Sequence, residues 1–242
     1  KQIYPNWQLC ISDDFSSNKE LLEILKKEEI LSDKINIIFR EYNGHISENS
    51  NSALKLVKGE WVALLDHDDL IREDALVWIA KGIIDNPEVL LIYSDEDKLD
   101  SNNHRTQPYF KPDFNLELLL GQNFFSHFGI YNKNLLDEIG GFRLGYEGSQ
   151  DYDLVLRCVN KINNQQILHI DKVLYHWRMH ELSASFNKNA KSYAPIAAKN
   201  AIQDYLYKKG EDIDVEILNH GYRVISKKIS LRNLLLIVEL KG

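Results

Sequence analysis

Three carboxylates stand within four residues at the end of an apolar run, in the segment Trp61-Val62-Ala63-Leu64-Leu65-Asp66-His67-Asp68-Asp69. The run has the length and composition of a buried strand. Crowded carboxylates repel one another unless a cation lies between them, and Mg²⁺ and Mn²⁺ prefer oxygen ligands. The segment therefore predicts a metal site that holds a phosphorylated substrate. The alternative is that Asp68 or Asp69 only caps the helix expected after it, which one Asp alone would favour.

The elements expected around these carboxylates alternate between strand and helix. Apolar periodicity and stop signals predict strands at 7–12, 35–40, 61–65 and 89–93, and helices at 19–31, 47–58 and 73–85. Such alternation predicts an α/β fold with a mostly parallel central sheet flanked by helices, in which ligands bind beyond the carboxyl ends of the strands. Asp13, Asp14, the 66–69 cluster and the acidic segment 94–98 are all expected at such ends.

The second half of the chain is less regular and predicts an α+β arrangement. Helices are expected at 116–120, 150–160 and 194–208, and strands at 127–131, 167–170 and 173–177, with weaker strands near Val215, Tyr222 and 234–240. Asp151 and Asp153 then lie in the first turn of their helix.

Composition narrows the class of protein. The chain has 242 residues, 44% of them hydrophobic, which supports a sizeable core. Its formal charge of −7 argues against nonspecific nucleic-acid binding. Cys10 and Cys158 both lie in apolar segments and are expected to be free thiols, as in a reducing cytoplasm. No apolar run approaches the roughly 20 residues that span a bilayer, the start is no signal peptide, and the missing initiator Met indicates a fragment.

Several segments, in this order, resemble family 2 glycosyltransferases, which have the nucleotide-sugar-binding GT-A fold. The resemblance covers residues 1–186 and rests on Tyr4-Pro5-Asn6-Trp7, Asp13-Asp14-Phe15-Ser16, Leu65-Asp66-His67-Asp68-Asp69, Gly140-Gly141-Phe142-Arg143, Gln150-Asp151-Tyr152-Asp153-Leu154 and Tyr175-His176-Trp177-Arg178. The segments Tyr93-Ser94-Asp95-Glu96-Asp97-Lys98 and Phe110-Lys111-Pro112-Asp113-Phe114 are similar to the bacterial branch that builds O-antigen and other surface polysaccharides, rhamnosyltransferases among them.

The resemblance implies a role for each matched carboxylate. Asp13 and Asp14 match the pair that contacts the base and ribose of the donor. Asp66 and Asp68 match the DxD element that holds Mn²⁺ or Mg²⁺ against the donor diphosphate, with Asp69 in support. Asp151 matches the general base that deprotonates the acceptor hydroxyl, and direct displacement then inverts the anomeric centre. Gln150 stands where the family usually has Glu, which leaves the tuning of this base open.

Six further residues have more than one interpretation. Arg178 and His180 are candidate contacts of the donor diphosphate, with a structural role as the alternative. The spacing of His176 and His180 would suit zinc on a helix, but the segment favours a strand, where residues four apart lie too far from each other. Lys98 is either a phosphate or acceptor contact or a solvated lysine, and Phe124 with Phe125 is either an apolar floor for the acceptor or core packing.

The resemblance also implies an organisation and partners. Residues 1–100 form the donor-binding half, 101–186 the acceptor and catalytic half of the same domain, and 187–242 a C-terminal helix with strands. The partners are a nucleotide-sugar donor and a glycan or lipid-linked acceptor, in the cytoplasm, with attachment to the cytoplasmic face of the membrane left open.

The first strand of the family, which is central in its sheet, would precede Tyr4. Without it, two neighbouring strands would keep unpaired backbone groups, each costing about 1 to 3 kcal/mol when buried. We expect an apolar segment elsewhere to fill this place, and Leu234-Leu235-Leu236-Ile237-Val238-Glu239-Leu240 is the best candidate by composition. The alternative is that this segment begins a second catalytic domain.

Three other functions compete with a transferase. A phosphohydrolase of the haloacid dehalogenase type also has Asp-x-Asp after a buried strand, but it needs Thr or Val where Leu70 stands. A phospho-acceptor receiver domain would use Asp13, Asp14, Asp66 and Lys98, but it is about half this size and leaves Asp151 unexplained. The third alternative is a catalytically inactive module that binds nucleotide-sugars.

Overall fold

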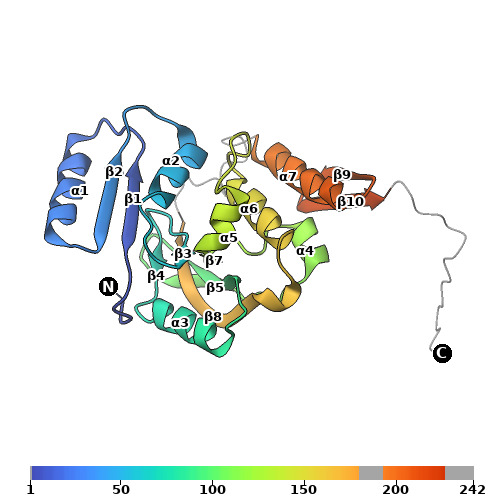
Figure 1. The fold of residues 1–242 in the computed structure, drawn as a ribbon, viewed down its shortest axis with the longest axis horizontal. Coiled ribbons are helices and arrows are strands. Elements are labelled where there is room, and N and C mark those ends of the chain that lie inside the picture. The colour runs from blue at the N-terminus through green and yellow to red at the C-terminus, as the bar shows by residue number, and fades with distance from the viewer. Residues whose placement is uncertain (1, 180–192, 227–242) are drawn as a thin grey trace, which may run out of the picture.

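The computed structural model describes residues 2–179 and 193–226 (Figure 1). The first half contains β1 (Leu9–Asp13), α1 (Lys19–Leu31), β2 (Ile35–Phe39), α2 (His45–Leu54), β3 (Trp61–Ala63), β4 (Leu70–Ile71), α3 (Ala75–Asp85) and β5 (Leu91–Leu99). The second half contains β6 (Arg105–Tyr109), α4 (Leu116–Gly121), β7 (Gly129–Asn132), α5 (Lys133–Ile139), α6 (Gln150–Val159), the 3₁₀ turn η1 (Asn164–Gln166), β8 (Ile167–Arg178), α7 (Ala194–Lys208), β9 (Ile213–Leu218) and β10 (Gly221–Ser226). The α/β class predicted from the alternation is confirmed.

The main sheet has six strands in the order β3-β7-β5-β8-β4, with β6 beside β5. β7 is antiparallel to both β3 and β5, and β8 is parallel to β5. β3, β5 and β8 therefore run in one direction, as the strand-helix alternation predicts. The sheet is nevertheless mixed rather than mostly parallel, because β7, β4 and β6 run the opposite way.

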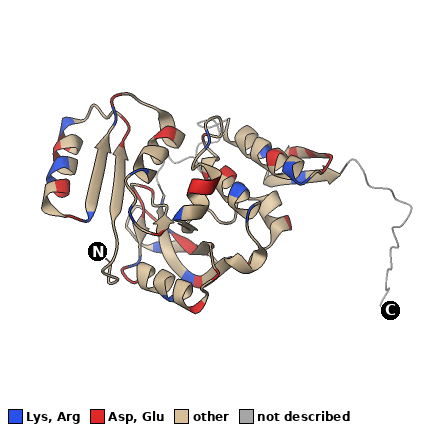
Figure 2. Cartoon of the chain, viewed as in Figure 1, with Lys and Arg blue, Asp and Glu red and all other residues tan. Residues whose placement is uncertain are grey.

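Helices cover both faces of this sheet. Alternate residues of β5 enter two different cores: Leu91 and Tyr93 pack with α6 and α7, whereas Ile92 packs with α3. This division follows from the two-residue period of a strand. By contrast, α1 lies outside these cores, and none of its residues is buried. In Figure 2, basic and acidic residues are interspersed along the ribbon of α1, as expected for a helix that faces solvent.

β5 extends further than the sequence predicts. The acidic segment 94–98 was expected to be a loop beyond the end of a strand, but it lies inside β5, and Asp95, Glu96 and Asp97 are buried. Each has a partner from a distant segment: His169 for Asp95, Lys111 for Glu96, and His176 for Asp97. Local periodicity cannot detect such partners, so the prediction of a loop for these polar residues is wrong.

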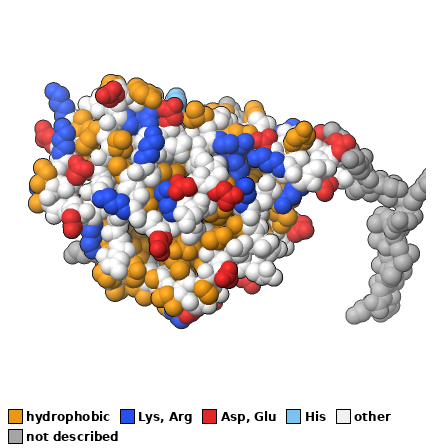
Figure 3. Space-filling view, in the orientation of Figure 1, with side chains coloured by type: hydrophobic (Ala, Val, Ile, Leu, Met, Phe, Trp, Pro, Cys, Tyr) orange, Lys and Arg blue, Asp and Glu red, His pale blue; other side chains and the backbone are white. Residues whose placement is uncertain are grey.

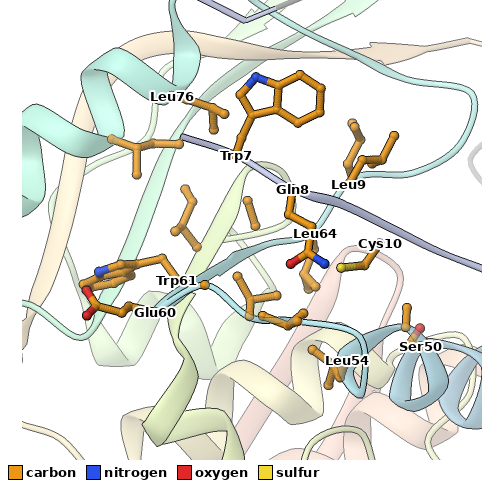
Figure 4. Close-up of a pocket in the computed structure, with 18 of the residues that line it drawn as sticks. Trp7, Gln8, Leu9, Cys10, Ser50, Leu54, Glu60, Trp61, Leu64 and Leu76 are labelled. Atoms are coloured by element: carbon orange, nitrogen blue, oxygen red, sulfur yellow. The ribbon is translucent and has the colours of Figure 1, made fainter. Parts of the chain in front are cut away.

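β1 and β2 form a separate parallel pair, and a cavity of about 690 Å³ lies between β1 and β3. Among the described residues, β1 pairs only with β2 and β3 pairs only with β7. Figure 4 shows Leu9 and Cys10 on one side of this cavity and Trp61 and Leu64 on the other. Within the described residues, no strand lies between the facing edges of β1 and β3. The segment 234–240 lies outside the described residues, so its placement here stays a prediction.

α3 covers one end of the cavity, through Leu76, Ile79, Ala80, Ile83 and Ile84. Figure 3 shows hydrophobic side chains gathered over α3, where Ile84 is 77% exposed. The other end of the cavity reaches Asp66, Ser126, His127, Gln150 and Asp151. The apolar space between the two sheets is therefore continuous with the acidic residues that the sequence singles out.

Candidate functional site

The turn at residues 66–69 links β3 to β4 and is fastened to β8. The amide of Asp69 donates to the carbonyl of Asp66 (3.2 Å), which closes the turn. The Tyr175 hydroxyl accepts from the Asp66 amide (3.2 Å) and donates to Asp69 Oδ2 (2.5 Å). Arg178 donates from its amide to Asp69 Oδ1 (2.7 Å) and from Nε to the carbonyl of Asp68 (2.9 Å). A long strand thus fixes the position of the acidic turn.

Two carboxylates and an imidazole meet at this turn. Asp66, Asp69 and His127 each offer one ligand atom, and these atoms all lie within 4.8 Å of one another. Carboxylate oxygen and imidazole nitrogen are suitable ligands for Mn²⁺, so the set present fits a divalent cation. Burial raises the pKa of Asp69 above its ordinary value, although the hydrogen bonds from Tyr175 and Arg178 act in the opposite direction.

Asp68 differs from Asp66 and Asp69 in its surroundings. It is half-buried in the same turn, with Oδ1 4.0 Å from His67 Nδ1. Asp69 is buried and lies close to Asp66 and His127. The family resemblance instead implies Asp68 as the partner of Asp66. Sequence reasoning missed His127, because the residue enters the site through a loop whose course depends on packing elsewhere in the fold.

Asp151 lies in the first turn of α6 and lines the same cavity as Asp66. Asn123 Nδ2 donates to Asp151 Oδ2 (2.8 Å). Burial is the main cause that raises the pKa of Asp151 above its ordinary value; the negative charge of Asp66 adds to it, and the charge of His127 opposes it. Asp151 is therefore close enough to interact electrostatically with Asp66 and His127. The sequence predicts this proximity for Asp66 and Asp151.

The remaining residues of the Gly-Gly-Phe-Arg and Gln-Asp-Tyr-Asp segments hold α6 in place. Gly140 ends α5 in the left-handed region (φ 78°), where glycine is unstrained. Arg143 and Arg157 both pair with Asp153, which is 1% exposed. Arg157 also donates to the carbonyl of Gly141 (2.6 Å). These contacts fix the start of the helix that carries Asp151.

Asp13 and Asp14 lie at the carboxyl end of β1, as predicted. Asp13 Oδ2 accepts from the amide of Ser16 (3.0 Å). Asp14 Oδ1 accepts from the amide of Gly44 (2.9 Å) and lies 3.0 Å from Arg40 Nε. Asp14 is thereby tied to the loop that leads into α2, and Asp13 to the turn that follows β1.

The candidates at the end of β8 have partners within the fold. His176 Nδ1 lies 2.5 Å from Asp97 Oδ1, on a strand as expected, which disfavours a helical zinc pair. The guanidinium of Arg178 contacts the acidic turn and also donates to Asn103 Oδ1 (2.5 Å). His180 lies outside the described residues.

The other candidates, Phe124, Phe125 and Lys98, also have contacts within the fold. Phe124 and Phe125 are 1% and 0% exposed and pack on Tyr93, so the idea of an apolar floor for the acceptor is wrong. Lys98 lies on β5 rather than in a loop, donates to Gln107 Oε1 (3.0 Å) and stands over the ring of Trp177 (5.1 Å).

The mixed, helix-covered sheet with an acidic turn at the end of β3 is an arrangement of the GT-A fold, and solved structures share this fold. Residues 1–349 of TarS from S. aureus superpose with a TM-score of 0.60 at 16% identity, over 94% of this chain and 90% of that one. A mannosyltransferase from Pyrobaculum calidifontis, solved with GDP-Man and Mn²⁺, gives a TM-score of 0.58 at 16% identity, over 86% of this chain and 56% of that one.

A family model described as glycosyl transferase family 2 matches residues 1–145. The chain belongs to this family, which removes the phosphohydrolase and receiver-domain alternatives.

Two relatives extend over most of the chain. An uncharacterised protein, y4gI, of Sinorhizobium fredii is 43% identical over 227 residues, 93% of this chain. The O-antigen biosynthesis protein RfbC of Myxococcus xanthus is 30% identical over 214 residues, 88% of this chain. The chain spans 25% of the first relative and 17% of the second. Within the residues that the structure describes, no helix has the length and apolar character needed to cross a bilayer.

Proposed function

We propose that this chain transfers a sugar, with inversion, from a nucleotide-diphosphate sugar to a glycan or lipid-linked acceptor in bacterial surface polysaccharide synthesis. The observation that supports this most strongly is that Asp151 and the Asp66 turn lie on one cavity and influence each other electrostatically. A donor diphosphate at the turn would then place its anomeric carbon between the two groups.

In the proposed reaction, Asp151 is the general base. The acceptor oxygen forms a bond to the anomeric carbon while the bond from that carbon to the diphosphate oxygen breaks, and the acceptor proton passes to the Asp151 carboxylate. Attack opposite the leaving group inverts the anomeric centre. The raised pKa of Asp151, caused mainly by burial, makes the carboxylate a stronger proton acceptor. Asn123 orients this carboxylate by donating from Nδ2 to Asp151 Oδ2.

The leaving diphosphate is proposed to bind at the acidic turn. A divalent cation, Mn²⁺ or Mg²⁺, would be held by Asp66, Asp68 and Asp69. When bound, it would neutralise the negative charge that grows on the nucleoside diphosphate. The guanidinium of Arg178, already on the turn, can also contact the diphosphate. Asp13 and Asp14 at the end of β1 are proposed to contact the base and ribose, and His180 the diphosphate.

The substrate class rests on the relatives. RfbC is named as an O-antigen biosynthesis protein, and an Escherichia coli relative that matches 34% of the chain is a β-1,3-glucosyltransferase that uses UDP-Glc and a diphosphoundecaprenol-linked sugar. We propose a cytoplasmic enzyme that meets its acceptor at the inner face of the membrane. In this proposal residues 1–100 bind the donor, residues 101–186 bind the acceptor and carry the base, and the full-length protein has further domains.

A donor panel tests this function. The chain is incubated with UDP-, GDP- and dTDP-sugars and Mn²⁺, with saccharide acceptors, and products are analysed by mass spectrometry and by the ¹H NMR coupling of the new anomeric proton. We expect one donor to be consumed and the product to have the anomeric configuration opposite to that of the donor. Nucleotide binding without turnover would favour the inactive binding module, and retention of configuration would contradict the proposed mechanism.

A further inference from the structure

A buried lysine lies next to the proposed cation site and has no role in the function described so far. The side chain of Lys111 is 0% exposed. Its ammonium donates to Glu96 Oε2 (3.0 Å), to the carbonyl of Phe125 (2.8 Å) and to the carbonyl of His127. An ammonium has three N–H donors, so all of them are used. Two of the three acceptors belong to the backbone of the loop that carries His127.

Glu96 binds the same loop through the amide of His127. Its Oε2 accepts both from Lys111 Nζ and from the amide of His127 (3.0 Å). The amide and the carbonyl of His127 are thus both held by one ion pair, and both members of that pair are buried. The amide of Lys111 in turn donates to Asp95 Oδ1 (2.9 Å), so β5 anchors the whole arrangement.

The imidazole is restrained separately from the backbone. It stacks on the ring of Tyr175 with centroids 4.7 Å apart and an interplanar angle of 10°, and the ring of Trp177 lies 5.8 Å away. Tyr175 is the residue that also bonds to Asp66 and Asp69. β8 therefore fixes the positions of both the imidazole and the acidic turn. As a result, one ligand atom of His127 lies within 4.8 Å of a ligand atom of Asp66 and one of Asp69.

Stability alone does not account for this lysine. Burial lowers the pKa of Lys111, and the negative charge of Glu96 opposes this effect only in part. Apolar residues of similar volume often replace a buried ion pair without loss of stability. An apolar pair cannot form hydrogen bonds to the amide and the carbonyl of one residue. A metal ligand that is held in position before the metal binds requires such contacts.

We propose that His127 is a protein ligand of the divalent cation, together with Asp66 and Asp69, and that Lys111 and Glu96 are positioning residues that hold it there. The inference rests on the cation of the proposed function and adds its nitrogen ligand.

The test uses Mn²⁺ itself, titrated into the 242-residue chain and followed by electron paramagnetic resonance, with and without UDP. His127→Phe keeps the stacking on Tyr175 and removes the ligand atom. The double variant Lys111→Met/Glu96→Leu keeps the volume and removes both contacts to the backbone of His127, together with the contact to the carbonyl of Phe125. Outer contacts of metal ligands typically contribute about 10- to 100-fold in affinity, so we expect losses of at least about tenfold in both variants. Lys161→Met removes an exposed ion pair with Glu138 and should leave Mn²⁺ affinity unchanged.

A second readout separates positioning from a general loss of structure. Mn²⁺ broadens the NMR signals of nearby nuclei, so the imidazole ¹⁵N signals of His127 should disappear at a lower Mn²⁺ concentration than those of the exposed His220, which connects β9 to β10. Figure 1 shows these two strands well away from β3 and β4. In the double variant, the His127 signals should persist to a higher concentration of Mn²⁺. Thermal unfolding shows whether each variant is folded.

The outcomes distinguish this inference from the proposed function. Loss of Mn²⁺ binding in Asp66→Asn with unchanged binding in His127→Phe would overturn the inference and leave the proposed function standing. Weaker UDP binding in His127→Phe without Mn²⁺, at unchanged Mn²⁺ affinity, would show a contact to the diphosphate and also overturn it. Absence of Mn²⁺ binding by the unmodified chain, with and without UDP, would overturn both.

Discussion

The Tyr175 hydroxyl donates a 2.5 Å hydrogen bond to Asp69 Oδ2 and accepts one from the amide of Asp66. Tyr175 is 0% exposed, and its ring also supports the imidazole of His127. One phenol therefore links β8 to Asp66 and Asp69, two of the three carboxylates proposed for the cation site, and to the imidazole beside them. Burial raises the pKa of Tyr175, so the hydroxyl stays protonated and able to donate.

Tyr175→Phe should loosen the acidic turn while keeping the stacked ring. Removing one partner of a buried hydrogen bond to a charged group costs about 1 to 3 kcal/mol, so we expect a lower free energy of unfolding by that amount and weaker Mn²⁺ binding. Chemical denaturation and Mn²⁺ titration measure the two effects. Tyr207→Phe is the control, since Tyr207 is 83% exposed. An unchanged Mn²⁺ affinity in Tyr175→Phe would show that the turn keeps its shape without this contact.

The pH dependence of transfer should reflect the raised pKa of Asp151. A general base acts only when deprotonated, so the rate should rise with pH through a pKa above the ordinary Asp value of 3.8 and then level off. Asn123→Leu removes a donor that favours the charged carboxylate, so this rise should move to higher pH. Gln122→Ala, at the neighbouring position, should leave the profile unchanged. A shift to lower pH in Asn123→Leu would contradict the assigned base.

Asp153 should contribute to stability rather than to chemistry. Asp153→Ala leaves Arg143 and Arg157 without their shared carboxylate, and breaking such a buried pair costs about 3 to 5 kcal/mol. Lys161→Ala removes an exposed ion pair and should change the unfolding free energy by less than about 0.5 kcal/mol. Urea denaturation followed by circular dichroism compares them. Equal effects of the two substitutions would refute the structural role of Asp153.

The two cysteines should differ in reactivity. Burial raises the pKa of Cys158 to about 12, and the residue is 0% exposed. Cys10 is half-buried and lines the cavity between β1 and β3. A thiol reagent such as DTNB at pH 8 should label Cys10 in the folded chain and both cysteines after unfolding. In Cys10→Ser, labelling of the folded chain should disappear; persistent labelling would mean that Cys158 is reachable.

The sequence predicted the fold where the pattern is local. The helices at 150–160 and 194–208 match α6 and α7, because apolar periodicity and start signals lie within each segment. The direction of β7 was not predictable, since an antiparallel strand between β3 and β5 has no distinct local pattern. The extension of β5 through Asp95 to Asp97 depends on His169, Lys111 and His176, which are remote in the sequence.

The candidate site shows the same division. Asp66 and Asp151 were predictable together because one follows a strand and the other begins a helix, and family resemblance places such positions at one cleft. His127 was not predictable: its place depends on Lys111, which is 16 residues earlier in the chain, and on Tyr175 from β8. A lone histidine before a strand gives no signal of its own. Among the described residues, the structure brings an imidazole nitrogen close to Asp66 and Asp69.

The central claim is that the acidic turn binds the donor diphosphate while Asp151 acts on the acceptor. The most direct test measures binding of UDP with Mn²⁺ by calorimetry, and transfer from the donor selected in the panel, in Asp151→Asn and Asp68→Ala. We expect Asp151→Asn to keep nucleotide affinity and lose transfer by about 10²- to 10⁴-fold, and Asp68→Ala to lose the Mn²⁺-dependent part of the affinity itself. An equal loss of nucleotide affinity in both variants would contradict the account.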